Sequence, residues 1–488
     1  MRIRFCGADR TVTGSCHLIE VNGLRLFLDM GMYQGAREEA RRINQWLPAK
    51  AKSADALILS HGHLDHCGKI PVLTRAGFSA PIYCTPATAE VARIVLEDSA
   101  KIQEEDAGYL NQRSVSPGEA PIRPLYVASD VPVVLRQMRK VPYQQRTDLG
   151  RGVSFTFFDA GHILGSAYIL LEWENNNPAE AGQKRKLLFT ADVGRYNTPI
   201  IRDPQTVPGP VDYVITESTY GGRVHAPISE VGPQLLDAVK FAIAHRSRIL
   251  VPAFAVGRTQ TILWYLQRFM QSGDIPAIPV YVDSPMGVEV SEVTRRFRDN
   301  YDEQTQAAIG ENDLFGSSRV VFARSVQESK KINSDNGPCV IIASSPTCEF
   351  GRILHHLSLS IERPNDLALF TGWTPLNTLG RRLQNGEKRV RIYDRWYDVR
   401  CQVRSIDGLS AHADSQELLK FLSPTLHKET QFYIVHGEPD QAEVFAERLV
   451  QNGAGRAMVP AMETSMLAES VASAKEVVPS SRTAATDE

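Results

Sequence analysis

The stretch "ILSHGHLDHCGKIP", residues 58–71, places three histidines and an aspartate within six positions. They are His61, His63, Asp65 and His66. The apolar run before them, "DALIL", predicts a buried strand, so these side chains lie where that strand ends. Imidazole and carboxylate groups bind metal ions, and one loop can aim alternate side chains at two neighbouring ions. Histidine makes up only 12 of 488 residues, which favours a metal site here over a polar loop with surface histidines.

Three more potential ligands follow apolar runs elsewhere in the chain. His162 ends "FFDAGH", Asp192 ends "LLFTAD" and His436 ends "FYIVH". A single histidine at a strand end is more often structural than a ligand. Together with the cluster, however, these residues predict that several strands end at a shared rim of one sheet and assemble one centre there.

The composition is typical of a soluble globular chain with two or three cores, at 43% hydrophobic and 23% charged residues. The formal net charge of -2 neither requires nor excludes a nucleic-acid partner, because a local basic patch would suffice. The seven cysteines are scattered and form no CxxC pair, which fits a reducing cytoplasm. We expect no transmembrane helix, no signal peptide and no additional RNA-binding domain at either end.

The order of predicted elements divides the chain into three stretches. The first alternates short strands with polar turns and contains a hairpin at Asn22-Gly23 and a long helix over 86–113. From about Pro208, strands alternate with helices, which predicts a parallel, doubly wound sheet. From about Tyr397 β-rich runs return, and the small, polar residues 469–488 predict a disordered tail.

An ordered set of motifs resembles the β-CASP nucleases of the metallo-β-lactamase fold, over roughly residues 1–468. The motifs are "FLDMG", "SHGHLDHCG", "ITESTYGG", "GLSAHAD" and "IVHGE", with His162 and Asp192 at two further motif positions. The resemblance implies an α/β fold, namely a metallo-β-lactamase αββα sandwich with an inserted β-CASP α/β domain. The sandwich would comprise residues 1–207 and 396–468, and the insertion residues 208–395.

The resemblance also implies a ligand set for two zinc ions, with manganese as an alternative metal. The first ion would be held by His61, His63 and His162, the second by Asp65, His66 and His436, and Asp192 would bridge them. Asp29 would orient the ligands from behind, and Asp65 would also belong to the catalytic groups. His412, oriented by Glu217, would protonate the leaving oxygen of an RNA phosphodiester, giving 5′-phosphate and 3′-hydroxyl products.

RNA would bind in a groove between the two domains, and four residues are candidates to contact it. They are Gly257, Arg258, Arg352 and Arg381. The first two stand at a predicted helix start, where backbone N–H groups favour phosphate, although a plain strand-to-helix turn fits equally well. The segment 381–404 has eight basic residues against three acidic ones, which fits either a phosphate-binding surface or a solvated face.

Two stretches depart from the family pattern, and their effect on substrate choice and activity stays open. Pro346 and Thr347 replace a glycine-methionine pair, Phe350 replaces a glycine, and residues 374–377 replace a glutamine with small or acidic neighbours. His355 and His356 are expected to be structural or surface residues of a helix.

Three alternatives to a ribonuclease are disfavoured. His436 argues against a DNA-processing nuclease, and the complete ligand set argues against a scaffold subunit. The inserted domain, together with Glu217 and His412, argues against a hydrolase of small molecules. The expected partner is therefore RNA, with no membrane. A homodimer stays open, as does the choice between endonuclease and 5′-exonuclease modes.

Overall fold

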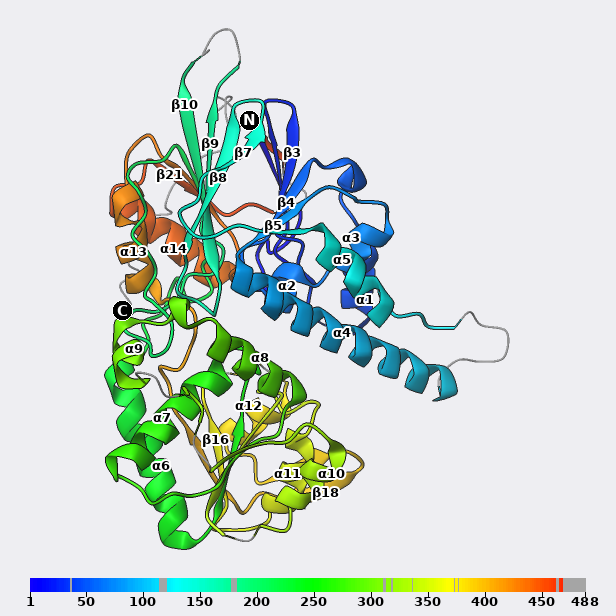
Figure 1. Cartoon of the computed structure of the whole chain (residues 1–488), viewed down its shortest axis with the longest axis vertical. Coiled ribbons are helices and arrows are strands. Elements are labelled where there is room, and N and C mark those ends of the chain that lie inside the picture. Colours follow the sequence, from blue (N-terminus) through cyan, green and yellow to red (C-terminus); the bar gives the residue numbers. More distant parts are fainter. Residues whose placement is uncertain are drawn as a thin grey trace, which may run out of the picture.

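The computed structural model describes residues 1–35, 37–113, 121–176, 182–309, 313–316, 319–335, 337–372, 374–375, 377–461 and 465–467. The predicted disordered tail, 469–488, lies outside the described residues, and so does Leu376 of the second departing stretch. The chain forms two units, which lie one above the other in Figure 1. We refer to the upper one as the sandwich unit and to the lower one as the inserted unit.

The sandwich unit contains two seven-stranded sheets. The first has the order β22 (Ser465–Leu467), β1 (Arg2–Phe5), β2 (His17–Val21), β3 (Leu24–Leu28), β4 (Ala56–Ile58), β5 (Ile82–Cys84) and β6 (Met138–Lys140). The second has the order β21 (Arg456–Met458), β20 (Gln431–Ile434), β11 (Tyr213–Thr216), β10 (Lys184–Phe189), β9 (Ala167–Glu174), β8 (Val153–Asp159) and β7 (Thr147–Gly150).

Three apolar cores hold these layers together. One lies between the two sheets and combines Leu26 from the first sheet with Phe157 and Leu171 from the second. A second packs α2 (Leu64–Cys67), α3 (Ile70–Arg75), α4 (Pro86–Arg113) and α5 (Val131–Gln137) on the outside of the first sheet. A third packs α13 (Ser415–Leu422) and α14 (Pro439–Gln451) on the outside of the second. The predicted αββα sandwich is therefore confirmed.

The inserted unit is built on a six-stranded parallel sheet. Its order is β14 (Val320–Phe322), β13 (Val280–Val282), β15 (Cys339–Ala343), β12 (Arg248–Pro252), β16 (Leu367–Phe370) and β19 (Gln402–Ser405). One face packs against α6 (Val231–His245), α7 (Arg258–Ser272) and α8 (Pro285–Arg296), and the other against α10 (Val326–Ile332), α11 (Ile353–Ser360) and α12 (Leu379–Gln384). The predicted doubly wound arrangement is confirmed. This unit also contains α9 (Glu303–Ile309) and a hairpin of β17 (Arg389–Ile392) and β18 (Arg395–Asp398).

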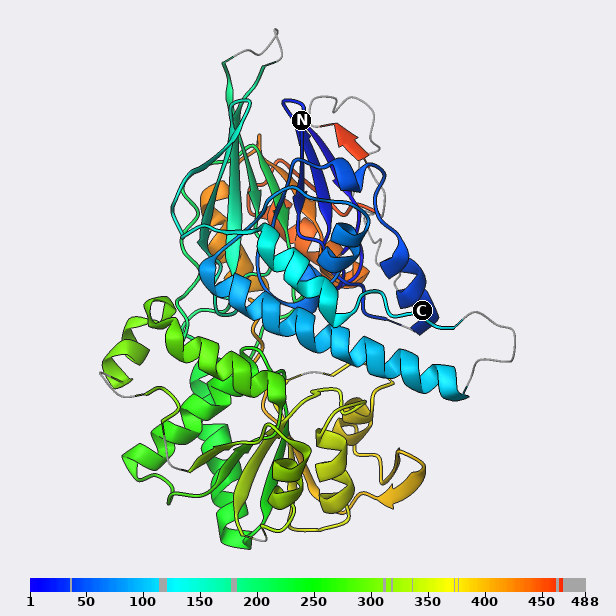
Figure 2. The same ribbon diagram turned by 45° about the vertical axis from the view of Figure 1, so that its right-hand side comes forward.

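The two units share packed surface as well as chain connections. Val290 and Val293 of α8, in the inserted unit, belong to the same apolar core as α4 of the sandwich unit. Figure 2 shows α4 lying across the top of the inserted unit. Because apolar side chains from both units are buried together, this contact helps to fix their relative position.

Local signals in the sequence placed several elements correctly. The hairpin predicted at Asn22-Gly23 joins β2 and β3, and both residues have the positive φ that such a turn requires, 49° and 78°. The helix predicted over 86–113 is α4. Among the described residues, no helix is both long and apolar enough to cross a membrane.

Two strands belong to different sheets from those that the sequence suggested. β11, expected in the insertion, pairs with β10 and β20 of the sandwich. β19, expected in the returning part of the sandwich, pairs with β16 of the inserted sheet. Strand pairing in the structure therefore argues for an insertion that begins after Thr216 and ends after Ser405.

Candidate metal centre

The predicted ligands meet where strands of both sandwich sheets end. The His61 loop follows β4 in the first sheet, whereas His162, Asp192 and His436 follow β8, β10 and β20 in the second. The sequence predicted a rim of one sheet. The structure instead brings together the rims of two facing sheets, which lets the ligands approach the centre from opposite sides.

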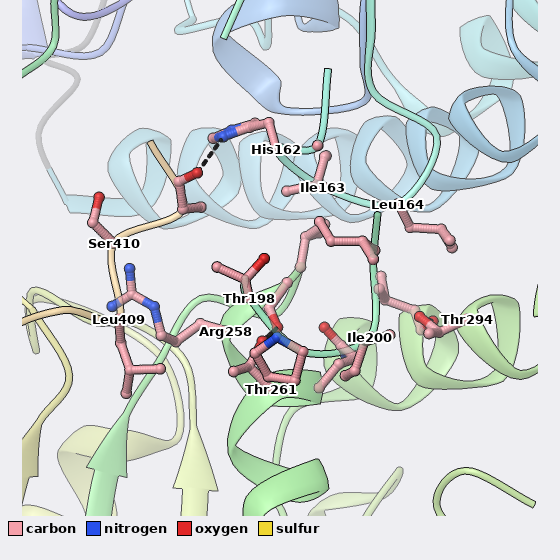
Figure 3. Close-up of a pocket in the computed structure, with 18 of the residues that line it drawn as sticks. His162, Ile163, Leu164, Thr198, Ile200, Arg258, Thr261, Thr294, Leu409 and Ser410 are labelled. Atoms are coloured by element: carbon pink, nitrogen blue, oxygen red, sulfur yellow. Dashed lines mark hydrogen bonds between the residues drawn. The ribbon is translucent and has the colours of Figure 1, made fainter. Parts of the chain in front are cut away.

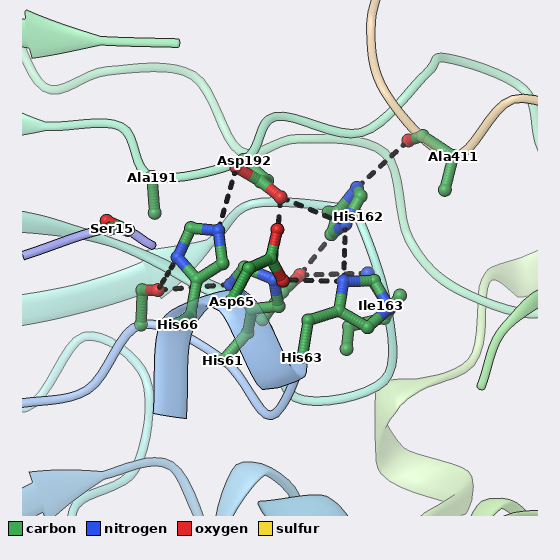
Figure 4. Close-up of polar contacts among 12 residues, drawn as sticks. Ser15, His61, His63, Asp65, His66, His162, Ile163, Ala191, Asp192 and Ala411 are labelled. Carbon is green, nitrogen blue, oxygen red and sulfur yellow. Dashed lines mark hydrogen bonds and ion pairs between the residues drawn. The ribbon is translucent and has the colours of Figure 1, made fainter. Parts of the chain in front are cut away.

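One group of potential ligands consists of His61, His63, His162 and Asp192. Nδ1 of His63 lies 3.1 Å from Nε2 of His61 and 3.2 Å from Nε2 of His162. Oδ2 of Asp192 lies 3.5 Å from the His61 nitrogen and 3.4 Å from the His162 nitrogen. Figure 4 shows these side chains converging on one point, so four donor atoms surround a space suited to a single ion.

A second group consists of Asp65, His66 and His436. Oδ2 of Asp65 lies 3.4 Å from Nε2 of His436. The other oxygen of Asp192, Oδ1, lies 3.2 Å from Nε2 of His66 and 3.4 Å from Nδ1 of His436. Asp192 therefore directs one carboxylate oxygen at each group, which is the geometry that a bridging ligand requires.

The backbone at these positions is adapted to the site. Ala191, directly before Asp192, has φ of 46°, and His436 has φ of 49°. Residues other than glycine adopt such values rarely, at a cost of roughly 1–3 kcal/mol each. The N–H of His436 donates to the carbonyl of Ala8 at 2.7 Å, which holds this residue in place.

Asp29 lies behind the second group, as the resemblance implies. Its Oδ2 accepts from Nδ1 of His66 at 2.7 Å, and its Oδ1 accepts from the backbone N–H of Ser60 at 2.8 Å. The Ser60 hydroxyl donates to Asp29 at 2.9 Å and lies 3.0 Å from Nδ1 of His61. When Nδ1 of each histidine donates in this way, Nε2 keeps its lone pair for a metal.

Further supporting contacts were not predicted. Nδ1 of His162 donates to the carbonyl of Ala411 at 3.2 Å, and the Thr219 hydroxyl lies 3.2 Å from Nδ1 of His436. Ser60 and Thr219 stand next to or two positions after predicted site residues, but hydroxyl residues are too common for such a position to be a signal. A contact made by a backbone carbonyl, such as that of Ala411, cannot be recognised from the amino-acid sequence.

The pKa shifts of the histidines differ between the two groups of potential ligands. Burial, together with neighbouring histidines, lowers the pKa of His61 and His162, and burial lowers that of His63 to about 4. These rings are therefore neutral, which is the form that binds a metal. At His66, burial opposes the charged form, yet Asp192 and Asp29 raise its pKa.

Three buried polar atoms of the centre make no well-directed hydrogen bond among the described residues, although they lie within 3.2–3.4 Å of other polar atoms of the centre. They are Nε2 of His66, Nε2 of His436 and Oδ1 of Asp192. Leaving buried polar groups without partners is costly. The donor set of nitrogen and oxygen atoms suits zinc or manganese, and unpartnered atoms that face one another are what a metal-binding group shows. The residues present therefore fit a metal centre.

His412 lies beside this centre and faces Glu217. Its Nδ1 is 3.2 Å from Oε2 of Glu217 and 3.9 Å from Oδ2 of Asp192. Although burial works against the charged ring, Glu217 and Asp192 raise the pKa of His412 to about 9. Glu217 itself is fixed, because its Oε1 accepts the N–H of Val193 at 2.6 Å. These two carboxylates therefore favour the protonated form of the His412 ring.

The four candidates for RNA contact lie in different surroundings. Gly257 and Arg258 line a cavity of about 60 Å³ between the units, together with His162 and Ala411 (Figure 3). The Arg258 guanidinium donates to the Thr371 carbonyl. Arg352 instead donates to the buried carboxylate of Asp283 at 2.6 Å and to two backbone carbonyls. Its contacts are those of a structural residue of the inserted unit.

Arg381 also makes a contact within its own unit. Its Nε donates to the carbonyl of Thr374 at 2.7 Å. His356 is buried and lies 2.7 Å from Asp283, in agreement with the structural role predicted for it.

The basic segment 381–404 is extensively paired with acidic side chains. The ion pairs are Arg382–Glu387, Arg389–Asp398, Arg391–Asp394, Arg395–Glu362, Arg400–Asp398 and Arg404–Asp237. β18 lies low in Figure 1, on the side of the inserted unit away from the sandwich. These observations favour the solvated-face interpretation of the segment.

Three family models match the chain. A metallo-β-lactamase superfamily domain matches residues 18–178, a β-CASP domain residues 259–383, and a Zn-dependent metallo-hydrolase RNA specificity domain residues 396–460. Ribonuclease TTHA0252 of Thermus thermophilus is 33% identical over 93% of this chain and 97% of its own length. The chain belongs to the β-CASP family of metallo-β-lactamase-fold hydrolases.

Two further relatives are archaeal proteins. An RNase J-like protein of Methanocaldococcus jannaschii is 26% identical over 91% of this chain and 94% of its own length. The transcription termination factor FttA of Cenarchaeum symbiosum is also 26% identical, and there the match spans 90% of this chain but 66% of FttA. A crystal structure of a protein of unknown function from Enterococcus faecalis V583 aligns over 95% of this chain and 99% of its own with a TM-score of 0.50. At 11% identity this likeness concerns the fold alone.

Proposed function

We propose that this β-CASP protein is a zinc-dependent ribonuclease that hydrolyses RNA phosphodiester bonds and leaves 5′-phosphate and 3′-hydroxyl ends. The observation that carries the proposal is the placement of Asp192, whose two oxygens face two separate groups of potential ligands. Relatives named ribonuclease and RNase J-like protein support RNA as the substrate.

In this proposal one zinc ion is held by His61, His63 and His162, and a second by Asp65, His66 and His436. Asp192 holds both, and manganese is the alternative metal. When bound, the pair of ions supplies Lewis acidity, lowers the pKa of water and offsets negative charge on the phosphate.

His412 acts as the general acid. Water attacks phosphorus and releases one proton to solvent, while the bond from phosphorus to the 3′ oxygen breaks and the proton of His412 moves to that oxygen. His412 then takes up a proton from solvent before the next turnover. The protonated ring that this step needs is favoured by Glu217 at 3.2 Å. Glu217 also keeps the ring in position, because its own carboxylate is held by backbone N–H groups of Val193 and Thr219.

The start of α7 contributes to substrate binding in the same proposal. Gly257 caps this helix with φ of 80°, and Arg258 begins it. The cavity that they line opens beside His162, so a phosphate there would meet the guanidinium of Arg258. Arg352 and Arg381 act indirectly, by shaping the loops of the inserted unit.

A cleavage assay on single-stranded RNA tests the proposal. The same RNA is labelled at either its 5′ or its 3′ end, and a DNA strand of equal sequence serves as the control. Protein stripped with a chelator should be inactive and should regain activity with zinc or manganese. Nuclease activity that survives complete metal removal in folded protein, or a preference for DNA, would overturn it. The size of the first labelled products separates internal cleavage from 5′-end cleavage.

A further inference from the structure

Phe350 is the most exposed large apolar side chain among the described residues, at 59%. Phe254, at 54%, is the other exposed phenylalanine of that part of the chain. Single exposed apolar residues are common and need no explanation by themselves. Both of them, however, follow strands at the carboxyl edge of the inserted sheet, from which the chain also leads to His412.

Both phenylalanines follow the carboxyl ends of neighbouring strands. β12 and β15 run parallel, with Pro252 opposite Ala343, and Phe254 and Phe350 come shortly after those positions. β19 is parallel to the same sheet and leads within seven residues from Ser405 to His412. The carboxyl edge of the inserted sheet therefore faces the metal centre. Figure 3 shows strands of the inserted unit pointing towards the cavity beside His162.

The loop that carries Phe350 is fixed on both sides of it. Before it, the Cys348 side chain is buried and the Glu349 carboxylate accepts the N–H of Leu379 at 2.5 Å. After it, Gly351 has φ of 83°, and a Cβ there would lie 2.5 Å from the Ser344 carbonyl oxygen. Arg352 is then held by Asp283 at 2.6 Å. α12, whose first residues bind this loop, lies at the end of the inserted unit nearest the sandwich in Figure 1.

An aromatic ring presented to solvent by a fixed backbone loses little conformational entropy when a partner binds it. Nucleobases stack on such rings whatever their identity, because every base has a π-face. Along the same edge, the Arg258 guanidinium lies 5.9 Å from the centre of the Phe254 ring. A cation beside an aromatic ring is the combination that single-stranded nucleic acid binds.

We propose that Phe350 stacks on one base of the RNA and so positions the strand relative to the metal centre. The proposal rests on the ribonuclease function proposed above, and it makes Phe350 a positioning residue. Because this contact would be lost, we expect Phe350→Ala to weaken RNA binding roughly tenfold.

The test combines protein variants with RNAs that each lack one base. Binding is measured by fluorescence anisotropy on a labelled single strand in which an abasic nucleotide is moved along the sequence. For the wild type, one abasic position should weaken binding about tenfold. Phe350→Ala should show no additional loss at that position, because the two changes remove the same contact. Phe350→Trp should restore the effect of the base.

Leu359→Ala is the matched control, because Leu359 is 42% exposed but belongs to α11. It should bind RNA as the wild type does. The stacking inference is wrong if Phe350→Ala binds RNA as Leu359→Ala does. It is also wrong if the affinity lost in Phe350→Ala adds fully to the affinity lost at every abasic position. These results concern binding and remain readable if the wild type cuts no RNA, an outcome that would instead overturn the proposed function.

Discussion

At the scale of single residues, Asp192 decides whether there is one centre with two ions. Replacing it with alanine removes a carboxylate that faces both ligand groups. We expect Asp192→Ala to bind fewer than one ion per chain, against two in the wild type, as measured by elemental analysis. Asp283→Asn is a control, because Asp283 is equally buried but lies in the inserted unit. It should lower stability without lowering metal content. Normal metal content in Asp192→Ala would show that Asp192 is not the bridge.

His412 offers a second test at this scale. We expect His412→Ala to retain its metals and its RNA affinity while turnover falls on the order of 10²–10⁴-fold. The decisive comparison uses a nitrophenyl phosphodiester, whose leaving oxygen is already a stable anion and needs little protonation. On that substrate the deficit of the variant should shrink. A deficit of equal size on both substrates, or the loss of an ion, would mean that His412 is not the acid.

At the scale of elements, the end of β8 provides a test of pH dependence. Asp159 ends this strand, and its Oδ1 accepts the N–H of Gly161 at 2.9 Å, at the start of the His162 loop. Burial raises the pKa of Asp159 from 3.8 to about 7. The folded state therefore keeps its proton in a range where the unfolded state has lost it. This lowers the free energy of unfolding as pH rises from about 4 to 7, by about 4 kcal/mol in total.

Replacing Asp159 with asparagine removes that dependence and keeps the acceptor oxygen. In urea unfolding at pH 4, 5.5 and 7, Asp159→Asn should gain stability relative to the wild type as pH rises. Asp148→Asn, at an exposed position in β7, should follow the wild type throughout. An Asp159→Asn curve parallel to that of the wild type would show that the carboxyl is ionised in both states.

Sequence patterns located helices and strands better than they predicted which strands pair in one sheet. α4 and the β2–β3 hairpin were predictable because helical periodicity and an Asn-Gly turn are local signals. The strand ends that carry His61 and His162 were predictable for the same reason. The sequence of an apolar strand such as β11 fits a sheet of either unit, because only its hydrogen-bonded neighbours decide the sheet to which it belongs. We therefore propose residues 217–405 as the insertion, a division that limited proteolysis would test.

At the scale of the whole molecule, the distribution of charge matters more than its sum. The formal net charge is only -2, but the sequence contains a basic segment, 381–404, that was a candidate phosphate-binding surface. In the structure its arginines are paired with carboxylates on the side of the inserted unit away from the sandwich. Arg258, by contrast, lies in the wall of the cavity beside His162. Arg258 and the basic segment 381–404 thus make opposite predictions for RNA binding.

Salt dependence separates them. A phosphate contact to single-stranded RNA changes the slope of log affinity against log salt by about 0.7, since binding releases counterions. Arg258→Ala should flatten the slope by about that amount. The triple variant Arg389→Ala, Arg391→Ala, Arg395→Ala removes three exposed cations but should leave the slope unchanged, because their carboxylate partners already balance them. The opposite result would be a slope that the triple variant flattens by about two and that Arg258→Ala leaves unchanged. RNA would then bind along the hairpin of β17 and β18, and the proposed contact between RNA and Arg258 would be wrong.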